Sequence, residues 1–234
     1  MTHGGRVIAV IPARGGSKGI PRKNLVLVGG RPLLWWTLDQ CRRTPEISVT
    51  YVSTDDEEIA RLAAQEGAEV IRRPPEISGD VASSEAALLH ALDIVETTSG
   101  TDSELIVFPQ ATSPLRHPED LTRAIELMRS SQADSLFSCH IAEHICLWEV
   151  QDGLCHPLTY DYRNRKPRQL EVKRYVENGS FYLVRPSHLK RTGCRLGGHI
   201  EMYVLEPWKG LQIDAPDDVY MVECFIDRVR PALK

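Results

Sequence analysis

A stretch rich in glycine and cations near the N-terminus carries the residues best suited to chemistry. It runs Ile11-Pro-Ala-Arg-Gly-Gly-Ser-Lys-Gly-Ile-Pro-Arg-Lys-Asn24 and follows an apolar run, residues 7–11, that is typical of a short buried strand. Glycines let backbone N–H groups approach an anion closely, and Arg and Lys supply the opposite charge. Residues 1–38 hold six Lys or Arg and no Asp or Glu, although the whole chain has a net charge of −4. This local excess predicts a polyanion site, with a nucleoside triphosphate as the best-fitting ligand.

Two familiar phosphate-binding loops do not match this stretch. A Walker A loop needs glycine, four residues and then Gly-Lys-Ser/Thr, whereas the order here is Gly-Gly-Ser-Lys-Gly. A dinucleotide fingerprint opens a helix, but Pro21 follows soon after the last glycine and would interrupt it. The alternative interpretation is a solvated basic surface loop, although few such loops follow so apolar a strand.

Strands and helices alternate along the rest of the chain. This rhythm is typical of an α/β domain with a mainly parallel sheet and ligand loops at the carboxyl ends of its strands. A polar interval from about 141 to 175 breaks the alternation and predicts an excursion from a single domain spanning 1–234. The expected strands are 7–11, 48–52, 68–71, 105–108, 134–139, 180–184 and 200–205. The expected helices are 32–43, a helix between Thr54 and Gly67, 83–95, a helix from Pro118 and a final one opening at 214–218.

Each candidate ligand loop follows an expected strand. These loops are 12–24, 72–84, 109–116 and 212–218, and a doubly wound sheet would gather them at one edge. Local alternatives remain for several of their residues. Arg73 could be a surface cation, Gln110 and Ser113 could satisfy turn backbone, and Asp214 could be only the N-cap of the last helix.

Composition narrows the class of protein. The chain of 234 residues is 42% hydrophobic and 26% charged, which is ordinary for a globular protein. Its six cysteines form no C-x-x-C pair, which is typical of reduced thiols in a cytoplasmic protein. Apolar runs are too short for a membrane span, and no signal-peptide pattern opens the chain. An acidic chain without a basic helical face argues against nucleic acid as a partner.

The glycine- and cation-rich stretch resembles the opening motif of the acylneuraminate cytidylyltransferases, the CMP-sialic acid and CMP-nonulosonate synthetases. Further blocks are similar to that family in the same order over nearly the whole chain. They are Val52-Ser-Thr-Asp-Asp56, Arg73 with Ser84, Gln110-Ala-Thr-Ser-Pro-Leu115, Glu177-Asn-Gly-Ser-Phe-Tyr182 and Ile213-Asp214.

The resemblance implies a Rossmann-like nucleotidyltransferase fold and a homodimer in which the excursion is exchanged between subunits. It implies that CTP reacts with a nonulosonic acid, a nine-carbon α-keto sugar acid, to give a CMP-sugar and pyrophosphate. In phosphoryl transfer, positioning and charge stabilisation do most of the catalytic work. A divalent metal ion, Mg²⁺, would assist by bridging phosphate oxygens.

The resemblance also assigns site residues. CTP would be held by Arg14, Gly15, Gly16, Ser17, Lys18, Asn24, Arg73 and Ser84. The sugar acid would meet Gln110, Ser113, Arg165, Arg168 and Tyr182, with Arg165 matching an active-site arginine of the family's excursion. Arg14, Lys18, Arg165 and Asp214 would be catalytic, and Asp214 would hold the metal.

One position departs from the family pattern. Members commonly carry Asp-x-Asp where this chain has Gln212-Ile213-Asp214. The change puts a two-metal arrangement in doubt and favours Mg²⁺ held mainly by Asp214 and the triphosphate. Two alternatives follow: the same chemistry on the eight-carbon acid Kdo, or a catalytically silent nucleotide-binding protein, for which Gln212 is the support. The Arg-Gly-Gly-Ser-Lys-Gly-Ile and Glu-Asn-Gly blocks favour nine-carbon acids.

Overall fold

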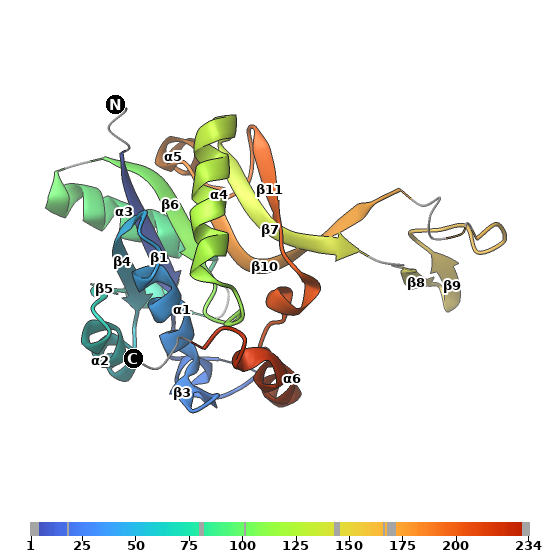
Figure 1. Cartoon of the computed structure of the whole chain (residues 1–234), viewed down its shortest axis with the longest axis horizontal. Helices are drawn as coiled ribbons and strands as arrows, with labels where there is room; N and C mark the ends of the chain where they lie inside the picture. Colours follow the sequence, from blue (N-terminus) through green and yellow to red (C-terminus); the bar gives the residue numbers. More distant parts are fainter. Residues whose placement is uncertain are drawn as a thin grey trace.

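A twisted sheet with helices on both faces forms the body of the protein (Figure 1). The computed structural model describes residues 5–17, 19–79, 82–100, 102–142, 146–165, 167 and 172–230. Within these residues seven strands form one sheet in the order β11-β7-β10-β6-β1-β4-β5. The strands are β1 (Arg6–Pro12), β4 (Ile47–Thr54), β5 (Glu69–Arg72), β6 (Ser103–Pro109), β7 (Ser135–Ala142), β10 (Arg174–Val184) and β11 (Ile200–Val204).

The sheet is mostly parallel, which confirms the predicted fold class. Strands β4 and β6 run parallel to β1, β5 to β4, and β11 to β7. Only β10, of the strands in the described sheet, runs antiparallel to its two neighbours, β6 and β7. The carboxyl ends of β1, β4 and β6 therefore lie at one edge, where the candidate loops begin.

Helices cover both faces because the central strands are apolar on both sides. Along β1, Val7, Ala9 and Ile11 pack into the core beneath α1, α2 and α4. The alternate residues Ile8 and Val10 pack into the core beneath α3 and α5. The helices are α1 (Leu33–Arg42), α2 (Glu57–Gln65), α3 (Ser84–Ser99), α4 (Pro118–Ser131), α5 (Pro186–Thr192) and α6 (Pro216–Ile226), with 3-10 turns η1 (Lys23–Leu25), η2 (Pro75–Ile77) and η4 (Pro207–Gly210).

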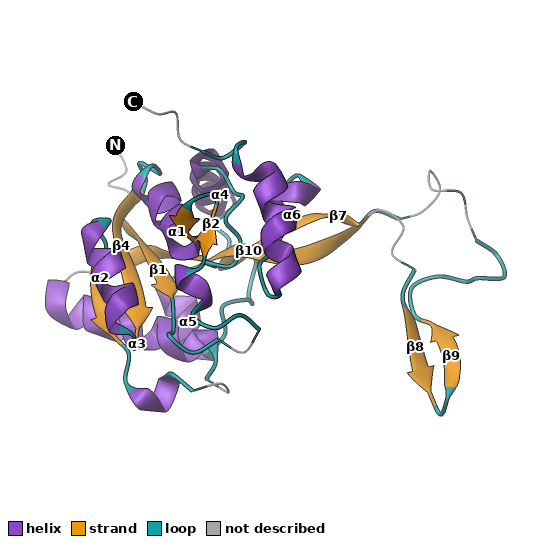
Figure 2. Ribbon diagram, turned by 90° about the horizontal axis from the view of Figure 1, so that it is seen from below, coloured by secondary structure: helices purple, strands orange, loops and turns teal. Residues whose placement is uncertain are grey.

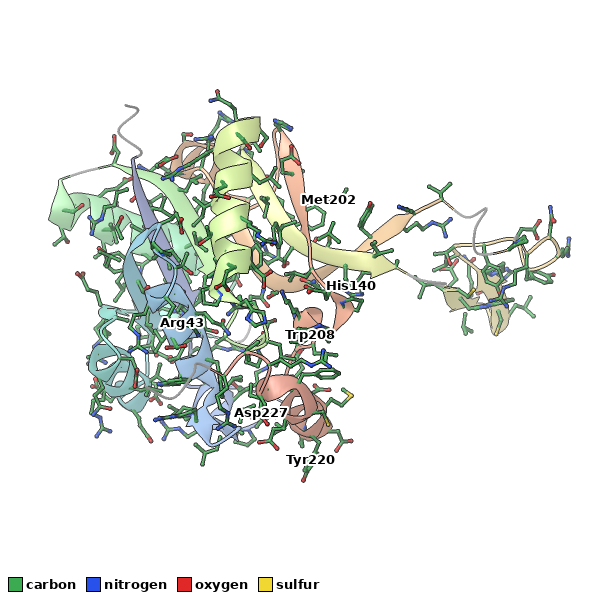
Figure 3. All side chains as sticks on the ribbon, in the orientation of Figure 1. Arg43, His140, Met202, Trp208, Tyr220 and Asp227 are labelled. Atoms are coloured by element: carbon green, nitrogen blue, oxygen red, sulfur yellow. The ribbon has the colours of Figure 1, made fainter. Side chains whose placement is uncertain are left out.

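A third apolar cluster holds α6 against the segment that follows the first loop. It includes Trp36 of α1, Ile213, and Val222 and Ile226 of α6. Trp208 of η4 stacks on Phe225 of α6, with ring centroids 5.8 Å apart, and Figure 3 shows it beside that helix. A short hairpin of β2 (Leu27–Val28) and β3 (Arg31–Pro32) lies next to α6. This cluster fixes the approach of Asp214 to the sheet edge.

The element boundaries differ from the sequence predictions in instructive places. The N-cap of α2 is Asp56, not Thr54, and its carboxylate accepts hydrogen bonds from the N–H groups of Glu58 and Ile59. Helix α5 was not predicted, because its seven residues are too few for a clear periodicity. Strand β10 begins at Arg174, well before the predicted 180, because its polar first half pairs with β7.

A second hairpin, β8 (Trp148–Gln151) with β9 (Leu154–Pro157), lies apart from the sheet in both ribbon views (Figures 1 and 2). It falls inside the predicted excursion, about residues 141–175. Strands β7 and β10 extend toward it beyond the helix-covered part of the sheet. Among the described residues, no helix combines the length and hydrophobicity of a membrane span.

Candidate active site

A cavity of about 460 Å³ opens at the sheet edge where β1 and β6 end. Loops from four distant parts of the chain contribute to it, as the doubly wound topology requires. Six of the predicted site residues line it: Arg14, Ser17, Asn24, Ser84, Gln110 and Asp214. Pro12, Gly19, Lys23, Phe108, Ala111 and Thr112 complete its wall. The structure therefore brings together the residues that the sequence placed in separate loops.

A smaller cavity of about 260 Å³ adjoins it and shares Arg14 and Ser84. Arg73 lines this second space and is nearly buried. Its Nε donates to Ser53 Oγ at 3.1 Å and its Nη2 to Ser53 O at 2.5 Å. Burial lowers the pKa of Arg73, the charge of Asp55 acts against this, and Arg14 lowers the pKa further. Arg73 is thus a fixed cation in the wall and not a surface residue.

Close backbone packing shapes the first loop. The N–H of Gly15 donates to Asp55 Oδ1 at 2.9 Å, and Asn24 Nδ2 donates to Arg14 O at 3.0 Å. A Cβ on Gly19 would lie 2.2 Å from the backbone oxygen of Asp214, so only glycine allows this approach. Gly16 is exposed and does not line the cavity. The loop is therefore held against α2 on one side and against Asp214 on the other.

Asp214 packs directly against the first loop at the cavity wall. Its Oδ1 lies 2.7 Å from Lys23 Nζ, with the lysine largely shielded from solvent and the carboxylate 65% exposed. The alternative in which Asp214 is only a helix cap is wrong. Ala215 is the N-cap of α6, and Asp218 accepts hydrogen bonds from the N–H groups of Asp214 and Ala215. The carboxylate of Asp214 is free to face the cavity.

The side chain of Gln212 contacts the turn within β10. Its Nε2 donates to Asn178 O at 2.6 Å. Among the described residues, no group of three or more His, Cys, Asp and Glu side chains is arranged to hold a metal ion. Mg²⁺ is commonly bound by one or two carboxylates together with substrate phosphates and water. One carboxylate at the wall of a cation-lined cavity fits a single Mg²⁺ of that kind.

The residues predicted to meet the sugar acid separate into two groups. Gln110 lines the cavity, whereas Ser113 is fully buried and is not among its lining residues. Tyr182 is buried behind Phe108, on which it stacks with centroids 5.7 Å apart, and its Oη donates to Glu177 Oε1 at 2.5 Å. Burial, with Glu177, raises the pKa of Tyr182 to about 12. Tyr182 thus supports the cavity wall from behind.

The described part of the basic tract of the excursion does not line this cavity. Arg165 is exposed in the outlying segment that carries β8 and β9. Lys18 and Arg168 lie outside the described residues.

Lys23 is the charged residue of the cavity wall, as described, to which no role was assigned from sequence. It was visible as a cation of the first motif, but spacing alone could not show that it turns toward Asp214, 191 positions away. Its neighbour Arg22 turns the other way and pairs with Asp56 and Glu58 of the α2 N-terminus. Thr112 and Phe108 were also missed, since they lie within ordinary strand-end sequence.

Known proteins share this arrangement of motifs. A family model described as cytidylyltransferase matches residues 8–152, more than half of the chain, including β1, its loop and the end of β6. The chain belongs to the cytidylyltransferase family. The motif blocks up to Leu115 and all the cavity residues except Asp214 lie within this matched region, whereas the blocks at 177–182 and 213–214 lie beyond it.

Two curated relatives and one solved structure illustrate the range of similarity of this cytidylyltransferase chain. It is 37% identical over 218 residues to N-acylneuraminate cytidylyltransferase A of Danio rerio, covering 91% of this chain and 49% of the relative. It is 36% identical to the N-acylneuraminate cytidylyltransferase of Oncorhynchus mykiss, covering 91% of this chain and 48% of that protein. The chain thus spans about half the length of these relatives.

The solved structure is a CMP:2-keto-3-deoxy-manno-octonic acid synthetase complexed with CTP. It superposes with a TM-score of 0.68, covering 95% of this chain and 99% of the other. At 17% identity this likeness shows a shared fold.

Proposed function

We propose that this protein activates a nine-carbon α-keto sugar acid with CTP, forming a CMP-sugar and releasing pyrophosphate. The observation that carries the proposal is the cavity that Arg14, Lys23, Gln110 and Asp214 line together. Two relatives that are 36–37% identical bear the name N-acylneuraminate cytidylyltransferase, which supports a sialic acid or a similar nonulosonic acid as the substrate.

The reaction asks the protein mainly for position and charge. The anomeric hydroxyl of the sugar would attack the α-phosphorus in line with the departing pyrophosphate. Arg14 and Lys23, at the cavity wall, would neutralise negative charge on the α-phosphate and the leaving group. The family resemblance adds Lys18 to these cations. Mg²⁺, held by Asp214 and the triphosphate, would supply further charge neutralisation on the phosphate oxygens.

The smaller cavity suits the nucleoside. It offers the rigid guanidinium of Arg73 and the polar start of α3 at Ser83 and Ser84, beside Arg14. A helix N-terminus favours an acceptor group, because its first N–H groups have no partner within the helix. In α3 the side chain of Ser83 accepts from Ala86 N, which leaves Ser84 at the cavity wall. CTP would thus lie along both cavities, with its phosphates toward Lys23.

Exposed apolar side chains support a homodimer. An isolated two-stranded hairpin is marginally stable in water, so β8 and β9 require a packing partner. Hydrophobic residues on this segment are well exposed: Leu147, Trp148, Val150, Leu154, Leu158 and Tyr162. The outer strand β11 also exposes Ile200, Met202 and Val204, and Figure 3 shows Met202 on that strand. A second copy of the chain would cover these surfaces and could receive Arg165 at its own cavity.

A pyrophosphate-release assay tests the proposed function. The protein is mixed with CTP, Mg²⁺ and, in turn, sialic, legionaminic and pseudaminic acids and Kdo. We expect release with at least one nine-carbon acid and little with Kdo. Release with Kdo alone would make it a Kdo-activating enzyme. CTP binding without release for any acid would show a silent nucleotide-binding protein.

A further inference from the structure

Arg116 is a fully buried arginine directly beneath the cavity wall. Its Nη1 donates to Ser180 O at 2.6 Å and, at 3.3 Å, to Ser180 Oγ. Its Nη2 donates to Thr37 Oγ1 at 2.6 Å and to Gln110 O at 3.0 Å. The hydrogen bonds that Arg116 makes among the described residues thus all go to neutral oxygens. Nothing in the family blocks or the cavity lining assigns this residue a role.

These bonds join three segments that are distant in sequence. Thr37 belongs to α1, Gln110 opens the loop after β6, and Ser180 follows the turn within β10. The N–H of Gln110 also donates to Ser180 O at 3.0 Å. Both backbone polar groups of Gln110 are therefore fixed through Arg116 or through the carbonyl that Arg116 binds. The side chain of Gln110 lines the cavity from this fixed backbone.

The same network reaches the segment that carries Asp214. The N–H of Ile213 donates to Thr112 O at 2.8 Å, within the loop that Arg116 holds. Gln212 Nε2 donates to Asn178 O, in the turn that precedes Ser180. That turn needs Gly179, which has a φ of +65° and lies against Gln212 and Gln110. Moving either segment would shift the other.

Burying a charged guanidinium to join these segments costs desolvation free energy. Burial lowers the pKa of Arg116 to about 10, with the negative charge of Asp120 acting in the opposite direction. The guanidinium therefore remains charged at neutral pH, and its hydrogen bonds are charge-assisted and stronger than neutral ones. Lysine is a point donor and cannot reproduce the planar fork that reaches three segments at once.

The geometry points to Arg116 as a positioning residue for the sugar-acid half of the site. It fixes Gln110 and the turn at 178–180, whereas the CTP half is held independently by the first loop, Arg73 and the start of α3. This inference rests on the proposed function, because it takes Gln110 as a contact of the sugar acid.

The experiment compares Arg116→Lys, Arg116→Met and Thr37→Val with the wild type. Thr37→Val removes only the Oγ1 acceptor on α1, which leaves the buried charge in place. Arg185→Lys is the matched control. In the wild type, Arg185 Nε donates to Ala133 O at 2.8 Å, so Arg185 too is an arginine bound to a backbone carbonyl. It does not line the cavity.

Three kinds of measurement are made on each variant. They are the KM and kcat for the sugar acid, the Kd of CTP alone by calorimetry, and hydrogen–deuterium exchange of segments 110–115 and 178–184. For Arg116→Lys we expect the sugar-acid KM to rise about tenfold or more, the effect of losing a charge-assisted hydrogen bond. CTP affinity, measured without Mg²⁺ so that the Asp214 segment contributes little, should stay within about threefold, since none of the hydrogen bonds described for Arg116 goes to the first loop, Arg73 or the start of α3. Hydrogen–deuterium exchange should be faster in both segments of Arg116→Lys than in the wild type. In Thr37→Val it should also be faster, but by a smaller amount.

Two results would overturn the inference. One is equal loss of CTP and sugar-acid binding, which would indicate general destabilisation. The other would be that Arg116→Lys and Thr37→Val have the same sugar-acid KM, and the same exchange rates in segments 110–115 and 178–184, as the control Arg185→Lys. If Arg116→Met does not fold, Thr37→Val still decides between these outcomes. If the wild type activates no acid, the proposed function fails, while exchange in the free protein still shows whether Arg116 holds both segments.

Discussion

At the mouth of the cavity, Lys23 and Asp214 form an ion pair between two residues that both face the expected position of the triphosphate. A cation beside the carboxylate proposed to hold Mg²⁺ would have two consequences. It holds the carboxylate at the cavity wall, and it lies within reach of the phosphates that the metal would bridge. Nucleotide and Mg²⁺ together could satisfy both partners, since each gains an opposite charge.

Replacing Asp214 with Ala is expected to lower kcat for Mg²⁺-dependent turnover by roughly 100-fold or more. Metal stabilisation of phosphate charge is worth several kcal/mol, and about 1.4 kcal/mol corresponds to a factor of ten. Steady-state pyrophosphate release at saturating CTP measures the change. Asp217→Ala, an exposed acid in the first turn of α6, is the control and should retain its rate. Wild-type turnover by Asp214→Ala would show that the carboxylate serves only its pair with Lys23.

At the scale of single elements, the N-terminus of α2 couples helix capping to the first loop. Asp56 caps the helix through Glu58 N and Ile59 N at 2.9 and 3.0 Å, and also pairs with Arg22. Partial burial acts to raise the pKa of Asp56. The backbone hydrogen bonds from Ile59 and Glu58 and the charge of Arg22 outweigh it, and the pKa is lowered.

Asp56→Ala is expected to lower the free energy of unfolding by about 1 kcal/mol at neutral pH, a typical loss for an N-cap. The folded-state pKa is depressed, so this contribution is present above the unfolded-state pKa of about 4 and is lost as the pH falls through the folded-state value. Urea unfolding at pH 7 and pH 3 should show that the difference in unfolding free energy between variant and wild type becomes smaller at pH 3. A difference in unfolding free energy that does not depend on pH would contradict the assignment of Asp56 as the N-cap. The control is Glu57→Ala, which should change the free energy of unfolding little because the Glu57 side chain is exposed.

The elements also show where sequence patterns succeed. Central strands such as β1 are apolar on both faces and were therefore recognisable. The observed last residues of β1 and β6 lie within one residue of the predicted ones. Strand β10 was only half predicted. Its first half, from Arg174, is polar and acquires strand structure by pairing with β7, a long-range interaction that no local periodicity records.

At the scale of the whole molecule, the excursion and β11 carry apolar side chains that a single chain leaves exposed to solvent. Val150 of β8 is 72% exposed and Leu154 of β9 is 64% exposed. Apolar groups on so small a hairpin gain stability only when another surface removes them from water.

The double variant Val150→Glu with Leu154→Glu is expected to be monomeric at micromolar concentration, whereas we expect the wild type to sediment as a dimer. Sedimentation velocity measures the mass, and CTP binding by calorimetry should be largely retained, since these side chains do not line the cavities. Tyr220→Glu on α6, an equally exposed residue outside both apolar surfaces, is the control. A monomeric wild type, or a double variant that remains dimeric, would rule out this interface.

The sequence by itself determined the alternation of strands and helices, the cation-rich loop and its family, because these depend on local periodicity and on residue types within short motifs. It also named half of the residues of the cavity wall, since loops at the ends of parallel strands must meet. Only the tertiary structure decided that Lys23 faces Asp214, that Ser113 is buried and that Asp56 is the cap. Only the fold places Arg116 beneath Gln110 and Ser180. These facts depend on which way a side chain turns against neighbours distant in sequence, and spacing carries no record of that.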